Sequence, residues 1–352
     1  MACGGEDFSI YGPLHLTNVD WNNEHHRRSV AASLAYGVYI LESDRQRKCR
    51  RSQLLAPPWW EFFHFKLLRQ LADDDDDDQF TIFGAIFEYK KRSNSFDQSP
   101  HYVVAFRGTL MEPESFVRDL ELDVSIILNG LRKTNRFRIA MKAVQDIIDL
   151  IGDCSKVWLT GHSLGAAMAI LAGKNMAKKG KFLEGFLFNP PFISVPIERI
   201  FKNKKLNHRI RFAGSVFTAG LAITSALKGD EGFQDNNNWF SAISGWIPWV
   251  FVNRVDYVCS EYIGYYEHRK KMDEIGFGAG AIAKLAARYS LGGFAMSMVG
   301  IKGVEIEEPM HLLPSANLIV NLNPPLKFWQ AHGLCQWWRP DLNLKCTVYK
   351  YK

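Results

Sequence analysis

The sequence lacks any pair or cluster of closely spaced cysteines. Its 352 residues include six cysteines, spread from Cys3 to Cys346, with no C-x-x-C pair and no cysteine–histidine cluster. Structural zinc sites and redox motifs need such spacing, so the sequence predicts no metal ion and no other cofactor. Scattered free thiols are typical of a reducing compartment, where disulfides do not persist.

Targeting and membrane-spanning segments are also missing. No basic and then apolar stretch opens the chain, and Met1-Ala2 does not fit the myristoylation signal, which needs glycine second. The longest uncharged, apolar-leaning run, residues 212–227, is too short and too rich in glycine, serine and threonine to span a bilayer. We therefore expect an intracellular protein, cytoplasmic or peripheral to a membrane, with no secretory signal peptide.

A strong excess of charge of one sign is absent as well. Lysine and arginine number 43 against 37 acidic residues, which gives a net charge of +6. The basic clusters at 45–51 and 202–211 contain no aromatic residues, so nucleic-acid binding is disfavoured. Weak attraction to an anionic membrane surface stays open. Nothing in the sequence indicates an oligomeric state.

The most informative stretch that is present runs from residue 157 to residue 176. An apolar strand, Val157 to Leu159, leads into Gly161-x-Ser163-x-Gly165, and an alanine-rich helix, Ala166 to Met176, follows. This is the context of a nucleophile elbow, in which the glycines let the chain turn sharply below the serine. The helix directs its N-terminal N–H groups and positive dipole end toward that serine. We predict that Ser163 is a nucleophile; an ordinary Gly-Ser-Gly loop is the alternative.

Strands and helices alternate along the chain and predict an α/β fold. The expected strands are 80–89, 102–106, 157–159, 185–189, 249–252 and 316–322, and the expected helices are 22–41, 61–71, 137–151, 166–176 and 262–271. This order is typical of βαβ units and predicts a mostly parallel central sheet flanked by helices. All of its strands are expected between residues 80 and 322.

We expect one domain rather than two, with an N-terminal segment that ends before residue 80. Residues 1–79 are interpreted as an N-terminal helical segment that packs on the core and ends in the acidic loop 73–78. An acidic run without regular ligand spacing is usually a solvated loop. Residues 80–352 form the main domain, with a cap-like insertion at 200–248.

A serine hydroxyl needs a histidine to take its proton and a carboxylate to orient that histidine. With an elbow of this kind the acid follows the serine, the histidine follows the acid, and both lie after strand ends. The histidines beyond Ser163 are His208, His268, His311 and His332. His332 follows the last expected strand and has Gly333 beside it, which favours it as the base. The alternative is a structural histidine beside nearby tryptophans.

For the acid, Asp256 is the best placed carboxylate, because it comes shortly after the apolar run 249–252. Its alternative role is that of a helix N-cap. The oxyanion hole needs the backbone N–H of Leu164, next to the nucleophile, and a donor from an earlier loop. Thr109 follows the strand 102–106 and offers its N–H and its hydroxyl. We interpret Arg107 as a structural former of ion pairs.

Together these residues resemble the class 3, or fungal-type, lipase family of α/β-hydrolases. The resemblance covers about residues 80–340, and its motifs occur in family order at 104–109 (VAFRGT), 161–165 (GHSLG), 188–191 (FNPP), 253–256 (NRVD) and His332. The segments 261–266 and 331–338 are similar to a plant lipase-like branch. Members of that branch are sometimes labelled GDSL esterase/lipase, although this chain contains no Gly-Asp-Ser-Leu block.

The resemblance implies an α/β-hydrolase fold and a lipase or esterase that hydrolyses acyl lipids through an acyl-enzyme. It implies Ser163, Asp256 and His332 as the triad, Thr109 and Leu164 as the oxyanion hole, and a lid at 111–123. Two alternatives stay open: a catalytically weak binding or signalling module on the same scaffold, and an acyltransferase. The aromatic residues of the insertion 200–248 either form a cap or membrane surface or pack on the core.

Overall fold

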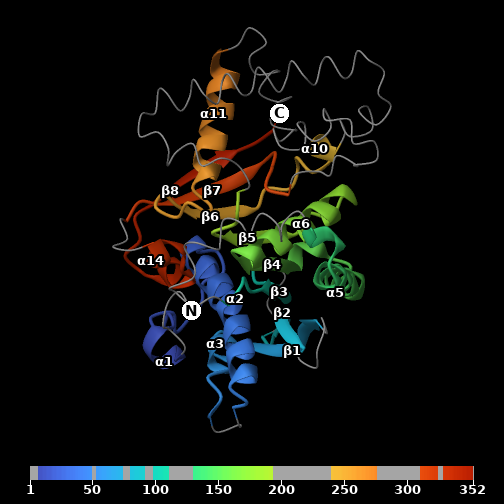
Figure 1. The fold of residues 1–352 in the computed structure, drawn as a ribbon, viewed down its shortest axis with the longest axis vertical. Helices are drawn as coiled ribbons and strands as arrows, with labels where there is room; N and C mark the ends of the chain where they lie inside the picture. The colour runs from blue at the N-terminus through green and yellow to red at the C-terminus, as the bar shows by residue number, and fades with distance from the viewer. Residues whose placement is uncertain are drawn as a thin grey trace.

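The computed structural model of the chain describes residues 7–49, 53–73, 80–91, 98–110, 130–192, 239–275, 310–323 and 328–351. Its centre is one eight-stranded sheet, and the strands follow one another across the sheet in their order along the chain (Figure 1). The strands are β1 (Phe65–Asp73), β2 (Thr81–Tyr89), β3 (Tyr102–Phe106), β4 (Val157–His162), β5 (Glu184–Phe188), β6 (Trp249–Asn253), β7 (Ala316–Asn321) and β8 (Leu344–Tyr349).

Strands β3 to β7 are parallel, whereas β1 pairs with β2, β2 with β3 and β8 with β7 in antiparallel fashion. Crossovers between parallel strands are right-handed, so a strand order that never reverses brings the connecting helices to one face. The helices α5 (Asn135–Ile151), α6 (Leu164–Lys178), α10 (Trp239–Ala242) and α11 (Glu261–Ile275) pack into the core on that face. The expected mostly parallel α/β sheet is thus confirmed.

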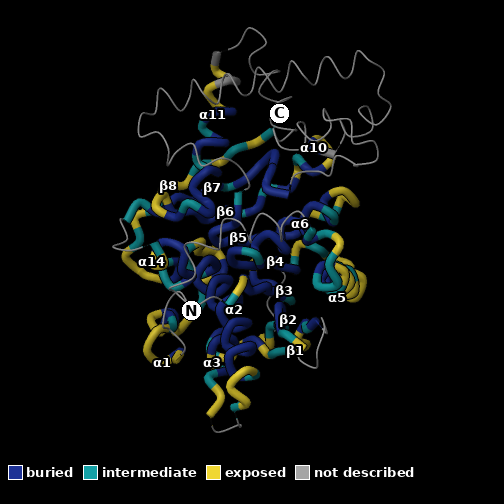
Figure 2. The backbone as a smooth tube through the Cα atoms, viewed as in Figure 1, coloured by how far each residue is buried: buried dark blue, intermediate teal, exposed yellow. Residues whose placement is uncertain are grey.

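Consecutive residues of the central strands are buried on opposite faces of the sheet. In β4, Leu159 packs with the crossover helices, and its neighbour Trp158 packs with α2 (Glu24–Gln46) on the other face. Leu187 and Phe186 of β5 are divided in the same way. Figure 2 shows these strands buried between the helices, while the outer side of α5 is exposed. A sheet covered on both faces explains why its strands are continuous apolar runs.

The second face is covered by both ends of the chain. Helix α2 begins after Asn23, whose side chain accepts hydrogen bonds from the N–H groups of His25 and His26. Beside it lie α1 (Phe8–Tyr11), α3 (Pro58–Glu61), α14 (Phe328–His332) and the 3₁₀ helix η4 (Leu334–Trp338). In Figure 1, α2 and α14 lie on the side of the sheet opposite α5 and α6.

Two expectations about the sheet are wrong. The helix expected at 61–71 is instead the end of the short α3 followed by β1, which pairs with β2. His64, beyond the end of α3, has φ of +63°, which is not a helical conformation, and from Phe65 onward the chain pairs with β2. Because β1 and β8 both lie outside 80–322, the sheet extends beyond those residues, and the segment 1–79 is not wholly helical.

The insertion expected at 200–248 is described only from residue 239 onward. Phe240 of α10 and Trp246 are buried there, and the indole Nε1 of Trp246 donates to the carbonyl of Leu183 at 2.8 Å. These two aromatic side chains pack on the core rather than over a pocket. The rest of the insertion, and the lid expected at 111–123, lie outside the described residues. Within the described part of the chain, no helix is both long and apolar enough to cross a bilayer.

Candidate active site

Ser163 lies in the sharp turn between β4 and α6. Its backbone has φ of +53° and ψ of −122°. Residues other than glycine rarely adopt this conformation, so the surrounding structure must enforce it. A Cβ at Gly161 would overlap the carbonyl of Gly165, and a Cβ at Gly165 would overlap the carbonyl of Phe106. Only glycine fits sterically at positions 161 and 165. A strained serine between two such glycines has the geometry of a nucleophile elbow.

Helix α6 begins at Leu164, directly after the serine. Ser163 accepts hydrogen bonds from Ala166 N–H and Ala167 N–H at its carbonyl, so the N–H of Leu164 lies in the first turn, at the positive end of the helix dipole. The loop after β3 approaches the same point: a Cβ on Gly108 would lie 2.9 Å from the Cβ of Ser163. Thr109, the next residue, is exposed. Both expected oxyanion donors thus belong to segments beside Ser163.

Asp256 and His332 are in direct contact. Asp256 comes three residues after β6 and His332 ends α14, yet Nδ1 of the imidazole lies 2.9 Å from Oδ2 of the carboxylate. Both side chains are buried. A carboxylate accepts and does not donate, so Nδ1 carries the proton and Nε2 is the basic nitrogen. The Oδ1 atom of Asp256 accepts the N–H of Val258 at 3.0 Å, which fixes the plane of the carboxylate.

A buried asparagine connects Asp256 to the segment of His332. The amide of Asn189 donates to Oδ2 of Asp256 at 2.6 Å and to the carbonyl of Ala331 at 2.9 Å. Its own oxygen accepts the indole N–H of Trp337 at 2.7 Å. Asn189 follows β5 with φ of +47°, a region in which asparagine is enriched. The sequence placed Asn189 only in the 188–191 motif and gave it no role.

The thiol of Cys259 is a further donor to the same carboxylate, with Sγ 3.1 Å from Oδ2 of Asp256. Burial, and after it the Asp256 charge, raise the pKa of Cys259 well above its usual range, so the thiol keeps its proton. Three donors therefore converge on one oxygen atom. Sequence reasoning missed Cys259, because a lone cysteine carries no spacing signal.

Tyr39 of α2 and His162 connect three segments around Ser163. The hydroxyl of Tyr39 accepts the N–H of Gly108 at 2.7 Å and lies 2.7 Å from Nδ1 of His162. The other ring nitrogen of His162, Nε2, lies 2.7 Å from the carbonyl of His332. Burial, reinforced by His332, lowers the pKa of His162 to about 3, so the ring is neutral. Since a carbonyl only accepts, Nε2 carries the proton and Nδ1 accepts from Tyr39.

Arg107 has a structural role in the described part of the chain. Its Nε donates to the carbonyl of Ile82 at 2.6 Å and its Nη1 to the carbonyl of Gly108 at 2.7 Å. These bonds go to the backbone, and the expected role of Arg107 as a former of ion pairs stays a prediction. The two hydrogen bonds fix the loop that leads to Thr109.

The other expected candidates do not join this group. His311 is buried against Phe192, and His268 lies within α11; His208 falls outside the described residues. Among the residues that the structure describes, no three histidine, cysteine or carboxylate side chains form a group that could hold a metal ion.

A mostly parallel sheet with a strained serine between a central strand and its helix defines an α/β-hydrolase. Residues 103–195 match the family described as Lipase (class 3). The chain is similar to a protein of Arabidopsis thaliana named as a GDSL esterase/lipase, with 48% identity over 366 residues that cover 100% of both chains. The chain therefore belongs to the class 3 lipase family and is a carboxylic ester hydrolase.

Two solved structures are also similar to the chain. One is a lipase from Rhizopus microsporus var. chinensis, with 22% identity, a TM-score of 0.31 and coverage of 48% of this chain and 58% of that one. The other is M37 lipase, with 13% identity, a TM-score of 0.37 and coverage of 87% and 89%. Both likenesses are distant.

Proposed function

We propose that the protein hydrolyses carboxylic esters of acyl lipids through a triad of Ser163, His332 and Asp256. The observation that carries this proposal is the buried contact of 2.9 Å between the His332 imidazole and the Asp256 carboxylate. It selects the tautomer in which Nε2 can take a proton. The strained elbow supports Ser163 as the group that gives it.

In this mechanism, Nε2 of His332 removes the proton of Ser163 as the hydroxyl oxygen attacks the ester carbonyl. The carbonyl oxygen becomes an oxyanion, which the N–H groups of Leu164 and Thr109 stabilise. His332 then protonates the leaving alcohol, and an acyl-enzyme remains on Ser163. Water, deprotonated by His332, releases the carboxylic acid and restores the serine.

The proposed substrate class is supported by the family and by the esterase/lipase name of the Arabidopsis thaliana relative. The acyl chain length and the head group of the substrate depend on residues outside the triad. Contact with an anionic membrane surface stays a prediction that rests on the mild positive charge.

The test is labelling and turnover in Ser163→Ala. We expect a fluorophosphonate probe to label the wild-type protein once and the variant not at all. Hydrolysis across p-nitrophenyl esters, acylglycerols and phospholipids should fall by about 10⁵–10⁶-fold in the variant. The exposed Ser155→Ala is the control and should behave as wild type.

Equal labelling of both proteins would exclude Ser163 as the nucleophile. Labelling without hydrolysis of any ester would overturn the proposed substrate class. Product analysis with a competing alcohol separates hydrolysis from acyl transfer, because transfer yields a new ester instead of the free acid.

A further inference from the structure

A cavity of about 230 Å³ lies at the opposite end of α2 from the triad. Its walls include Phe186, Trp249 and Phe251 of β5 and β6, Ile319 of β7 and Leu344 of β8. Trp249 is the first residue of its strand, so the cavity reaches the N-terminal ends of the strands, whereas Ser163 lies beyond a C-terminal end. Arg27 on its rim precedes Tyr39 by twelve residues, about 18 Å along the helix. The cavity is therefore separate from the site of Ser163.

Arg28, a second arginine lining the cavity, is a buried cation without an ion pair. Its Nε donates to the carbonyl of Trp337 at 2.7 Å, whereas its Nη2 is buried and meets no hydrogen-bond acceptor among the described residues. No described carboxylate forms an ion pair with it. Burial lowers its pKa to about 10, although the nearby Glu24 charge acts in the opposite direction. An isolated buried guanidinium is costly, and an anion placed beside it removes that cost.

The neighbouring Arg27 also has one buried nitrogen, Nε, without an acceptor among the described residues, but its charge is paired. Arg27 pairs with Glu184, donates to Gln98 at 2.8 Å and lies over the ring of Trp158 at 5.4 Å. Its charge is thus compensated within the protein. Arg28, which has the exposed Glu24 carboxylate nearby but no ion pair among the described residues, lines the cavity.

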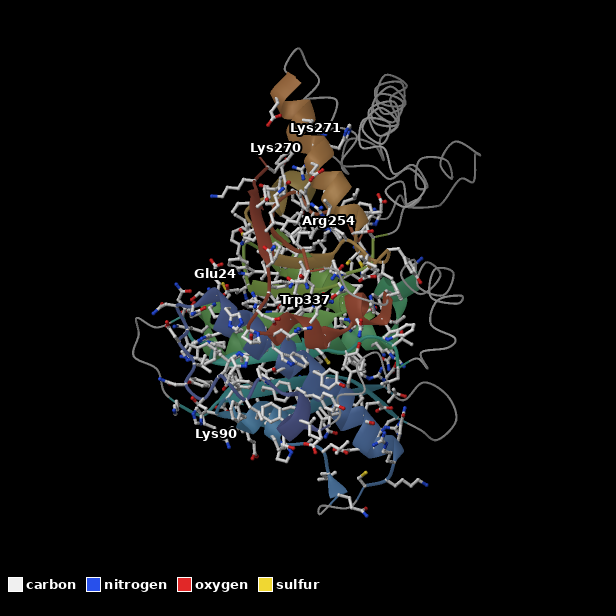
Figure 3. All side chains as sticks on the ribbon, turned by 90° about the vertical axis from the view of Figure 1, so that its left-hand side faces the viewer. Glu24, Lys90, Arg254, Lys270, Lys271 and Trp337 are labelled. Atoms are coloured by element: carbon white, nitrogen blue, oxygen red, sulfur yellow. The ribbon has the colours of Figure 1, made fainter. Side chains whose placement is uncertain are left out.

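The rim defines the charge and size of a ligand. Glu24 is exposed at the start of α2, and Figure 3 shows it at the edge of the molecule, with Trp337 further inside. Its carboxylate disfavours ligands with two negative charges, such as phosphate esters. The volume is below the roughly 300–1,000 Å³ of pockets for drug-sized ligands. A singly charged, small and largely apolar molecule fits these walls.

We propose that this cavity binds a small carboxylic acid, with its carboxylate on Arg28 and its apolar body against strands β5 to β8. A guanidinium and a carboxylate form parallel hydrogen bonds, which a neutral analogue cannot reproduce. The aromatic floor supplies the remaining contact. The proposal does not depend on the triad, although the acid released by ester hydrolysis belongs to the same chemical class.

The experiment uses Cys346, the only described cysteine that is exposed, which lines the same cavity. N-ethylmaleimide modification of each cysteine is followed by peptide mass spectrometry with and without hexanoate. We expect hexanoate to slow modification of Cys346 in a saturable way and to leave Cys154 and Cys335 unaffected. Hexanamide, the neutral analogue, should protect Cys346 from modification at least tenfold more weakly than hexanoate at the same concentration. Protein phosphonylated at Ser163 should show the same protection.

Arg28→Met should weaken protection by hexanoate at least tenfold, whereas Arg138→Met, an exposed arginine on α5, should not. Equal protection by hexanoate and hexanamide in the wild-type protein would overturn the proposal even if Arg28→Met did not fold. Unchanged protection in a folded Arg28→Met would also overturn it. Stronger protection by inorganic phosphate than by hexanoate would identify a phosphate site instead. Loss of protection on phosphonylation would place the acid at Ser163.

Discussion

At the scale of single residues, Asn189 holds Asp256 and the segment of His332 with one side chain. Its amide hydrogens reach Asp256 and the carbonyl beside His332, and its oxygen is occupied by Trp337. An aspartate would bring a like charge to the carboxylate, and an aliphatic residue would leave buried polar groups without partners. Asparagine meets both demands and also tolerates the left-handed backbone.

Replacing Asn189 with alanine is expected to lower kcat about 10–100-fold with little change in KM, because Asp256 and His332 lose their common support. The free energy of unfolding should fall by about 2–4 kcal/mol, since buried groups lose partners. Steady-state kinetics and urea unfolding measure the two effects. Asn321→Ala, a buried asparagine at the end of β7, is the control and should lose stability but not kcat. An equal loss of kcat in both variants would contradict the assignment.

The two buried histidines predict how stability depends on pH. Burial, together with neighbouring charge, lowers the pKa of both His162 and His311 to about 3, against about 6.5 in the unfolded chain. Below pH 6.5 the unfolded state binds protons that the folded state refuses. Stability from this source is therefore complete above pH 6.5 and is lost as the pH falls toward 3.

Urea unfolding between pH 7 and pH 5 should show a free energy that falls by up to about 1.4 kcal/mol per pH unit for each of these histidines. His162→Gln should remove the contribution of His162 to this dependence of the unfolding free energy on pH. A free energy that stays constant over this range would show that neither ring is kept neutral by the fold.

At the scale of elements, α2 contributes hydrogen bonds near Ser163 as well as packing in the core. Through Tyr39 it touches the loop of Gly108, and through His162 it reaches the backbone of His332. Three separate segments thus share one hydrogen-bond chain. An N-terminal helix therefore connects the loop of Gly108 to the segment of His332.

Tyr39→Phe removes the acceptor of the Gly108 N–H and the donor to His162. We expect kcat to fall about 10-fold or more, with KM nearly unchanged, and stability to fall by about 1–3 kcal/mol. The exposed Tyr11→Phe serves as the control. An unchanged kcat in a stable Tyr39→Phe would show that α2 only packs.

The sequence predicts the helices and strands whose pattern is regular, and it predicts Asp256 and His332 as neighbours because chain order and strand ends place them on one edge. The structure does bring these two side chains together; their catalytic roles stay predictions. Tyr39 was beyond reach, since a tyrosine within a buried helix has no pattern that indicates a hydrogen bond to residue 108. The sequence does not indicate β1, because buried and exposed residues do not alternate regularly along this strand.

At the scale of the whole molecule, the sheet separates two cores of different character. The crossover face is largely aliphatic and alanine-rich, whereas the α2 face contains closely packed aromatic rings. Trp158 lies at the centre of the second face, with ring centroids 5.8 Å from Trp21 and 4.6 Å from Phe186. The N-terminal segment is therefore a layer of the same body.

Trp158→Ala should lower the free energy of unfolding by about 3–5 kcal/mol, because a fully buried indole is replaced by a cavity. The midpoint of urea unfolding, followed by near-ultraviolet circular dichroism and by esterase activity, measures the loss. Leu150→Ala, an exposed position on α5, should change it by less than about 0.5 kcal/mol. If activity survived at the wild-type midpoint while the dichroism signal shifted, the two faces would be independent.

The coincidence of strand order with chain order has a consequence for synthesis on the ribosome. Each new strand can pair at the growing edge of the sheet as it emerges, from β1 to β8, without opening a pair already formed. The aromatic packing on the α2 face is completed later than the early strand pairs. Tyr36 and Trp59 emerge early, but Trp338, which packs on both, emerges only after β7. A nascent chain thus carries an uncovered aromatic surface until Trp338 has emerged, and exposed surface of this kind favours aggregation.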